Sequence, residues 1–257
     1  MKNKRSLVEV VIPIYKENLS VLELKSLQQA YNILNKYPLI IIKPKSLDLS
    51  ELLKRFPLLK TKTFDDHYFN KISGYNTLML SEVFYSGFLH TKYILIYQLD
   101  AYVFKDELIH WCEKGYDYIG APWLKKPIYN LPIISGIMKL CRIYDKHKGV
   151  KNKQELYNKI GNGGFSLRKV NSHYETVIKE QEHIRLFLQQ KHHLYNEDVF
   201  WATVSSFNYP EATEAVGFAF DKYPSLCYKL NNKTLPFGCH GWYKRKMKSF
   251  WKPVIGF

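Results

Sequence analysis

The chain has 257 residues, 46% of them hydrophobic and 24% charged, which is typical of a globular protein and excludes a disordered or fibrous chain. This length predicts one domain, over residues 1–241, followed by a short tail at residues 242–257. The formal net charge of +15 favours an anionic partner, such as nucleic acid, a nucleoside diphosphate or an anionic membrane surface.

The first half of the chain alternates predicted strands and helices. A β-branched run at residues 7–15 predicts a buried strand, and Ser20 followed by Glu23 has the spacing of a capping box that begins a helix. A second buried strand at residues 39–42 completes the opening of a parallel α/β sheet. The pattern then predicts a helix at 75–90, a strand at 93–97, a helix at 106–114 and a strand at 116–123.

The second half is less regular. Residues 124–158 mix eight lysines and arginines with prolines and apolar residues, and we expect a mobile, basic excursion there. A glycine-rich segment, Gly161 to Arg168, precedes a long polar helix predicted at residues 171–192. Another helix opens at Asn196 with acidic residues in its first turn, where the helix dipole favours negative charge.

Cysteine spacing and the N-terminus predict a cytoplasmic protein. The four cysteines lack the spacing of zinc ligands, so we expect free thiols in a reducing compartment. The apolar run from Leu7 to Ile14 is too short for a signal peptide or a membrane span. We therefore expect a cytoplasmic chain that a peripheral contact could hold on the inner face of the cell membrane.

Several motifs stand in a consistent order along the chain: Gly74–Asn76, Tyr97–Phe104, Tyr116–Trp123, Gly161–Arg168, Glu197–Trp201 and Pro236–Trp242. With them the chain resembles a bacterial family of uncharacterised, glycosyltransferase-like proteins, the DUF5672 family, assigned to the GT-A superfamily. The resemblance implies a single Rossmann-like α/β domain with a mixed, mostly parallel sheet. It also implies a hexosyltransferase-like enzyme that moves a sugar from a nucleotide-sugar donor to a glycan or lipid-linked glycan in surface polysaccharide synthesis.

The resemblance implies a Mn²⁺ or Mg²⁺ site, because GT-A enzymes usually neutralise the departing diphosphate with a metal held by a DxD motif. This chain departs from that motif. Asp100 is either its first member, with Tyr102 in place of the second, or its last, with Gln98 in place of the first. We favour the latter, which keeps the metal-binding carboxylate, and expect His240 as a second ligand. If His240 does not bind metal, lysines would replace the metal, and Asp100 itself could merely cap the next turn.

The Glu197-Asp198 pair resembles the xED motif of GT-A enzymes. In that motif the aspartate is the base that takes the proton of the attacking hydroxyl, so Asp198 is expected to catalyse an inverting transfer. Glu197 is expected to bind acceptor hydroxyls. The alternative is an acidic helix start that only stabilises the dipole.

Glycines and aromatic residues mark the expected donor site. The segment that holds Gly163 and Gly164 does not match GxGxxG or a Walker loop, which argues against dinucleotide or ATP binding by those modes. In the family interpretation it lines the junction of donor and acceptor sites, although a simple turn is an alternative. The resemblance places the nucleotide near Pro13, Tyr15 and Glu17, with ribose or diphosphate contacts from Tyr75 and Asn76.

The tail interleaves aromatic residues with lysines and arginine between Trp242 and Trp251. Such a segment either lies on an anionic membrane surface or packs on the core with a solvated basic face. A nucleotidyltransferase is an alternative function, but the glycine-rich basic loop that it needs after the first strand is missing. A nucleic-acid-binding module would fit the charge, yet no RNP, KH or helix-turn-helix signature is present, so no specific nucleic acid is expected. A glycan-binding protein without catalysis stays open.

Overall fold

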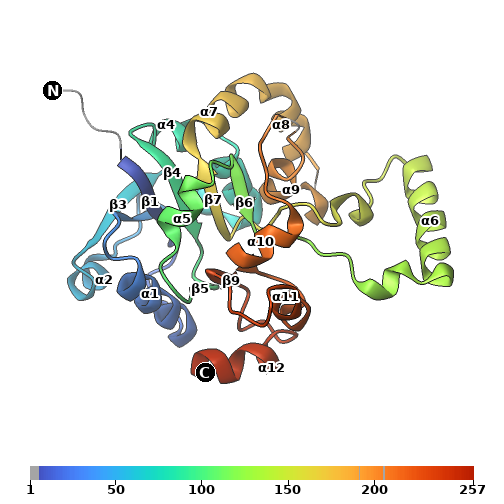
Figure 1. The fold of residues 1–257 in the computed structure, drawn as a ribbon. Helices are drawn as coiled ribbons and strands as arrows, with labels where there is room; N and C mark the ends of the chain where they lie inside the picture. Colours follow the sequence, from blue (N-terminus) through green and yellow to red (C-terminus); the bar gives the residue numbers. More distant parts are fainter. Residues whose placement is uncertain (1–5, 191, 205) are drawn as a thin grey trace.

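A six-stranded sheet forms the centre of the computed structural model, which describes residues 6–190, 192–204 and 206–257 (Figure 1). Its strand order is β3-β2-β1-β4-β7-β6. The strands from β3 to β4 are parallel, whereas β7 runs antiparallel to both β4 and β6. The predicted mostly parallel α/β sheet is therefore confirmed. The strands are β1 (Ser6–Pro13), β2 (Leu39–Pro44), β3 (Leu59–Phe64), β4 (Thr91–Tyr97), β6 (Tyr118–Gly120) and β7 (Phe165–Lys169).

Both faces of the central strands are buried. Successive side chains of a strand point to opposite faces, so in β4 Tyr93 and Leu95 pack on one side of the sheet, and Ile94 and Ile96 pack on the other. This explains the continuous apolar runs of β1 and β4, because a strand covered on both faces needs no polar alternation. The edge strand β3, which the sequence pattern did not predict, exposes Lys60, Thr61 and Thr63.

Helices cover the two faces of the sheet. The capping box of Ser20 and Glu23 begins α1, as predicted, and α1 packs in the same core cluster as Tyr93. The helix predicted at 75–90 is divided into α3 and α4, because Ser81 caps a new helix there. The one predicted at 171–192 is likewise divided into α7 and α8 at Glu180. These helices are α1 (Val21–Ile33), α2 (Ser50–Arg55), α3 (Lys71–Met79), α4 (Glu82–Ser86), α5 (Leu108–Glu113), α7 (Val170–Lys179), α8 (Gln181–Leu188), α9 (Glu197–Trp201) and α10 (Ala212–Phe218).

The segment at 124–158, expected to be an irregular excursion, contains a regular helix. α6 (Pro132–His147) projects from the body on two connecting segments (Figure 1). Those segments carry short 3₁₀ turns at Pro127–Asn130 and Lys153–Leu156. The prolines that suggested a loop stand outside the helix interior, since Pro132 occupies the first helical position, where its missing N–H costs nothing. The segment projects from the body, and its central part is a helix (Figure 1).

A small second sheet brings the C-terminal part of the chain to the edge of the central one. Its order is β5 (Ala101–Val103), β9 (Gly238–His240), β8 (Ala219–Phe220). α11 (Pro224–Leu230) and the short α12 (Lys248–Trp251) pack beside it. Trp242, Met247 and Trp251 of the tail are buried in this cluster. The tail therefore packs on the core through its apolar side chains and leaves its basic ones in solvent.

Candidate functional site

A cavity of about 790 Å³ opens at the carboxyl edge of the central sheet. β4 ends at this edge and the antiparallel β7 begins there, with Tyr97 paired to Phe165. The backbone N–H of Gln98 donates to the carbonyl of Gly164 at 2.8 Å, which ties the two loops together. Ligands of open α/β sheets bind at such an edge, so the cavity has the expected location.

The predicted site residues, with one exception, come together around this cavity. Glu17 is exposed and is not among the described residues that line it. The short turn after β1 directs Tyr15 toward the cavity instead, so Glu17 is not part of the donor site in this structure. The predicted residues that line the cavity are Pro13, Tyr15, Tyr75, Asn76, Gln98, Asp100, Gly163, Gly164, Glu197, Asp198 and His240.

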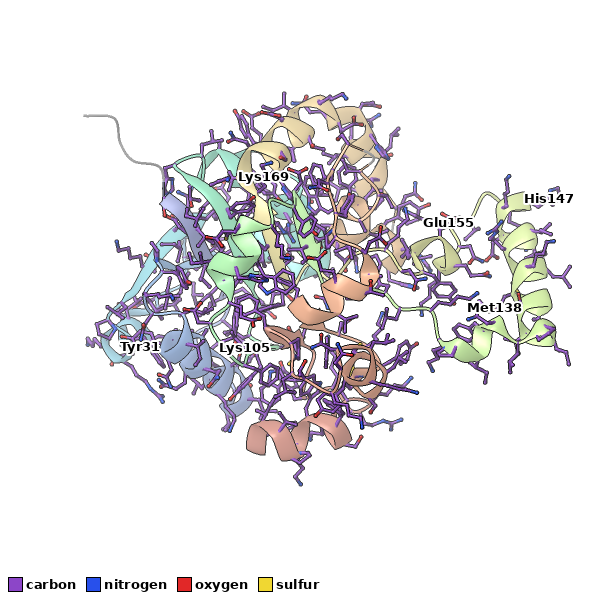
Figure 2. The ribbon with its side chains drawn as sticks, viewed as in Figure 1. Tyr31, Lys105, Met138, His147, Glu155 and Lys169 are labelled. Atoms are coloured by element: carbon purple, nitrogen blue, oxygen red, sulfur yellow. The ribbon has the colours of Figure 1, made fainter. Side chains whose placement is uncertain are left out.

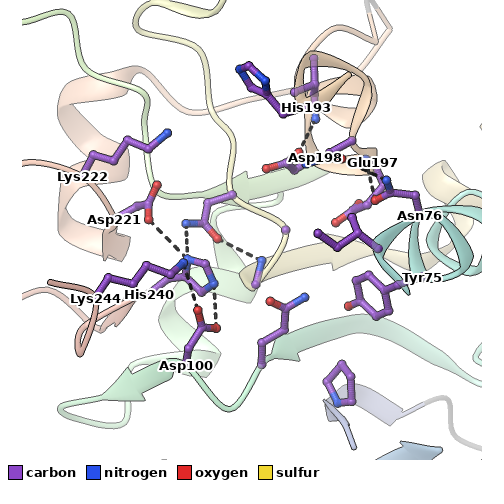
Figure 3. Close-up of a pocket in the computed structure, with 18 of the residues that line it drawn as sticks. Tyr75, Asn76, Asp100, His193, Glu197, Asp198, Asp221, Lys222, His240 and Lys244 are labelled. Carbon is purple, nitrogen blue, oxygen red and sulfur yellow. Dashed lines mark hydrogen bonds and ion pairs between the residues drawn. The ribbon is translucent and has the colours of Figure 1, made fainter. Parts of the chain in front are cut away.

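Asp100 and His240 meet because β5 and β9 are paired. Ala101 lies opposite His240 in that ladder, and Nε2 of His240 is 2.8 Å from Oδ1 of Asp100. On the other carboxylate oxygen, Lys244 Nζ lies 3.1 Å from Oδ2 (Figure 3). Nδ1 of the imidazole is 3.3 Å from Oδ1 of Asp221 and 2.8 Å from the side-chain nitrogen of Asn162. The result is a buried imidazole between two carboxylates.

These charges set the protonation of the cluster. Burial alone would lower the pKa of His240, but Asp100 and Asp221 raise it to about 9. Burial opposes ionisation of Asp100, yet His240 and Lys244 hold its pKa well below the usual range. At neutral pH the cluster is therefore an ionised network, with the positive charge of His240 and Lys244 facing the cavity.

The glycines before β7 allow this close packing. A Cβ on Gly164 would lie 2.3 Å from Nε2 of His240 and 2.7 Å from Oε1 of Gln98. A Cβ on Gly163 would lie 1.8 Å from Oε1 of Glu197. Neither position has room for a larger residue, so both glycines are needed to bring the side chains of the site to the sheet edge.

Asp198 and Glu197, adjacent in sequence, have opposite environments. Asp198 lines the cavity at the start of α9, where it accepts the backbone N–H of Val199 at 2.9 Å. Burial and the neighbouring Glu197 raise the pKa of Asp198 to about 7. Glu197 is buried and paired with Arg168, whose Nη2 lies 3.1 Å from its Oε2. Glu197 also lines the cavity, and its Oε2 makes no hydrogen bond of normal geometry with any described residue, so the expected contact with acceptor hydroxyls stays a prediction.

Asn76 and Tyr75, also adjacent in sequence, differ in their contacts. The side-chain oxygen of Asn76 accepts the N–H of Glu197 at 3.2 Å, and its nitrogen donates to Asn196 at 3.1 Å, so Asn76 holds the first turn of α9. Tyr75 points into the cavity (Figure 3), and its hydroxyl is buried without a hydrogen-bond partner among the described residues. A ligand in the cavity would satisfy this hydroxyl.

Sequence reasoning missed several functional side chains: Asn162, Arg168, Asp221 and Lys244. No local pattern marks Asp221, which follows a two-residue strand. Lys244 was assigned to the tail because it stands in a run of basic residues. Arg168 stands beside Lys169 at the polar end of β7, and no local pattern shows that its side chain is fully buried.

The fold is that of known glycosyltransferase structures. The galactosyltransferase LgtC, solved with donor and acceptor sugar analogues, is 10% identical with a TM-score of 0.56, and the alignment covers 96% of this chain and 93% of that one. Mouse xyloside xylosyltransferase 1 is 12% identical with a TM-score of 0.53, over 91% and 97%. The glycosyltransferase GlyE of Streptococcus pneumoniae TIGR4 is 11% identical with a TM-score of 0.52, over 97% and 62%. Such likenesses confirm the GT-A fold.

No curated protein matches the chain in sequence. A family profile does, and it covers the central sheet from β3 onward, but not β1 and β2, together with the glycine segment, Asp198 and His240 of the cavity. That profile, described as "Protein of unknown function (DUF5672)", matches residues 58–240, most of the chain, and the chain therefore belongs to this family.

Proposed function

We propose that this protein transfers a sugar from a nucleotide-sugar donor to a glycan or lipid-linked glycan acceptor, in the synthesis of a surface polysaccharide. One observation carries the proposal: a single cavity joins one pole, where the cations His240 and Lys244 stand beside the carboxylates of Asp100 and Asp221, to a second pole, the carboxylate of Asp198, whose pKa is raised to about 7. A transfer from a diphosphate needs these two poles, because negative charge develops on the leaving group while the attacking hydroxyl must lose its proton.

The donor would lie along the ends of β1 and β4. Tyr15 supplies an exposed ring at this end of the cavity, and Gln98 and the unpartnered hydroxyl of Tyr75 supply polar contacts. The diphosphate would then face Lys244 and the Asp100–His240 pair. The leaving diphosphate carries its negative charge next to the cations of the cluster, which lowers the barrier for its departure.

The Asp100–His240 pair fits a divalent metal. Nε2 of His240 is buried, makes no hydrogen bond of normal geometry with any described residue, and lies beside a carboxylate oxygen. Asp221 beside Nδ1 would orient the ring for this purpose. The Nε2 proton of His240 would be displaced on metal binding, and Asp100 and the neutral imidazole would then hold Mn²⁺ or Mg²⁺, which would neutralise charge on the diphosphate. Phosphate oxygens would complete the ligand set.

Asp198 would act as the base. Its carboxylate takes the proton of the acceptor hydroxyl as that oxygen attacks the anomeric carbon, and the bond from that carbon to the diphosphate breaks. A single displacement of this kind inverts the anomeric centre. A carboxylate with a pKa near the working pH suits proton abstraction better than an ordinary aspartate does. Glu197, paired with Arg168, would position α9 and raise the basicity of Asp198.

A thermal-shift screen tests the proposal. UDP-, GDP-, CMP- and dTDP-sugars are compared with and without Mn²⁺, because a ligand that binds the native state raises its apparent stability. We expect one nucleotide class to stabilise the protein, and Asp100→Asn to remove that effect. Glu175→Gln, an exposed carboxylate on α7, is the matched control and should keep it. A protein that responds to no nucleotide sugar under any of these conditions would refute the proposal.

A further inference from the structure

The outward face of α6 is apolar and has no cover among the described residues. Four large side chains recur along the helix at intervals of four, three and four residues, so they form one stripe. Their exposed fractions lie between 57 and 80%. A core helix would bury these side chains, and a fully solvated helix would have polar residues at these positions. The stripe consists of Ile133, Ile137, Leu140 and Tyr144.

Contacts with the rest of the protein hold α6 in place. The opposite side of α6 is attached to the segment that returns to the body, where Gln154 Nε2 donates to the carbonyl of Met138 at 2.7 Å. Asn152 donates to the carboxylate of Asp145. Further along the returning segment, Lys151 Nζ lies 5.1 Å from the centre of the Phe187 ring on α8. α6 is thus held on one side by the returning segment, while its apolar stripe is exposed. Figure 2 shows the helix, on which Met138 and His147 are labelled, standing away from the body.

The face of α6 opposite the stripe is basic, as the helical spacing of its residues places it. Lys139, Arg142 and Lys146 are exposed, and no ion pair links them to another described residue. Asp145 is the one acidic residue of α6, and its carboxylate is engaged by Asn152. A surface that combines an apolar stripe with free cations is complementary to an anionic phospholipid surface, which offers both an apolar interior and negative headgroups.

We propose that α6 docks this protein on an anionic membrane. The stripe would enter the interface between headgroups and acyl chains, and the cations of the opposite, polar face would add electrostatic attraction to the anionic surface. No described helix is both long and apolar enough to cross a membrane. The 16 residues of α6 would therefore lie parallel to the surface over about 24 Å. This location differs from the tail, whose Trp242 and Trp251 are buried.

A second copy of the chain is the other occupant to consider. Pairing two α6 helices through their stripes would leave both basic faces in solvent and would make no use of their cations. An anionic membrane takes up the stripe and is also attracted by the cations of the polar face. The charge pattern therefore favours the membrane.

Docking would also position the cavity. The segments that carry α6 supply part of its wall, through Leu124, Tyr129, Lys153 and Tyr157. A docked α6 would bring this wall close to the lipid surface, where a lipid-linked acceptor has its sugar. This consequence rests on the proposed glycosyl transfer, whereas the docking itself does not.

Vesicle co-sedimentation tests the docking without sugar or nucleotide, so its outcome is independent of the proposed reaction. Vesicles of phosphatidylcholine alone are compared with vesicles that contain phosphatidylglycerol as well. The double variant Ile137→Ser/Leu140→Ser should weaken binding to the anionic vesicles at least about tenfold. The matched control Ile178→Ser/Leu186→Ser removes two exposed apolar residues from α7 and α8 and should bind as the unaltered protein does.

A charge variant and a probe complete the test. Lys139→Gln/Arg142→Gln/Lys146→Gln should reduce binding to anionic vesicles by about fivefold for each cation removed. Cys141 on α6 is the one exposed cysteine among the described residues, so an environment-sensitive dye attached there should shift to the blue when vesicles are added. Equal vesicle binding by the stripe variant and its control would overturn the proposal. So would a dimer in sedimentation velocity that only the stripe variant dissociates.

Discussion

Asp198→Asn should increase the stability of the protein while it stops the reaction. The pKa of Asp198 is raised from 3.8 to about 7, because burial and Glu197 disfavour the charged form. Above pH 7 the folded protein holds this unfavourable charge, whereas the unfolded chain ionises freely. Asparagine has the same shape, keeps an oxygen for the N–H of Val199 and carries no charge. The substitution therefore removes a cost that the native state accepts for function.

The size of the effect follows from the pKa difference. Each pKa unit corresponds to about 1.4 kcal/mol, and Asp198 keeps some contact with solvent, so we expect the variant to gain roughly 2 to 4 kcal/mol at pH 8. The gain has a defined pH dependence. Because the folded pKa is raised, the native state loses stability as pH rises from the unfolded value toward about 7. The difference between variant and unaltered protein should be near zero at pH 4 and level off above pH 7.

Urea unfolding at pH 4, 6 and 8 measures this difference in stability. The rate of sugar transfer tests the role of Asp198 as the base. We expect kcat/KM of the unaltered protein to rise with pH through about 7, and the variant to lose on the order of a hundredfold or more while donor-induced stabilisation remains. Asp117→Asn is the control of opposite sign. Burial opposes ionisation of Asp117, but Ser172, the N–H of Asn208 and Lys169 lower its pKa, so its loss should destabilise the protein at pH 8.

The reasoning about Asp198 fails if the gain in stability of the variant over the unaltered protein is no larger at pH 8 than at pH 4, since the carboxylate would then not be desolvated. If transfer survives in Asp198→Asn, another group is the base. The two readouts are separate, so the electrostatic and the catalytic argument can fail independently.

Other substitutions probe the rest of the site. Asp100→Asn should abolish Mn²⁺-dependent stabilisation by the nucleotide sugar in the thermal-shift assay, because one charged ligand of the pair with His240 is lost. Gly164→Ala should reduce the transfer rate by on the order of a hundredfold, since its Cβ would displace the imidazole; Gly136→Ala on α6, where a Cβ meets open space, should be neutral. Arg168→Met should cost about 3 to 5 kcal/mol in urea unfolding, because it leaves a buried carboxylate unpaired.

Each of these outcomes has a contrary result. If Asp100→Asn still shows Mn²⁺-dependent stabilisation, the metal does not bind at the Asp100–His240 pair. Equal transfer rates for Gly164→Ala and Gly136→Ala would show that the loop before β7 has room to move. If Arg168→Met is as stable as the unaltered protein, Glu197 does not depend on its buried partner, and the proposed support of α9 is wrong.

Local sequence patterns determined the framework of the fold. The apolar runs of β1 and β4 predicted buried strands, because a strand covered on both faces needs apolar residues at every position. The capping box at Ser20 predicted the start of α1 for a similar reason, since both partners of its hydrogen bonds lie within one turn. Family motifs then led to Asp100, Asp198 and His240, which all line the cavity.

The tertiary structure decided which of these residues meet and in what state. His240 reaches Asp100 only because β9 pairs with β5, and the same pairing brings Lys244 to Asp100. Glu197 and Asp198 are neighbours in sequence, yet Arg168 neutralises only one of them. α6 was not predicted although its apolar residues recur at helical spacing, because the prolines and basic residues of segment 124–158 were given more weight than that periodicity. The periodicity of apolar residues in the sequence reflects contacts within one helix or strand. The protonation states of a site depend on strand pairing and burial between distant segments, which the sequence pattern does not show.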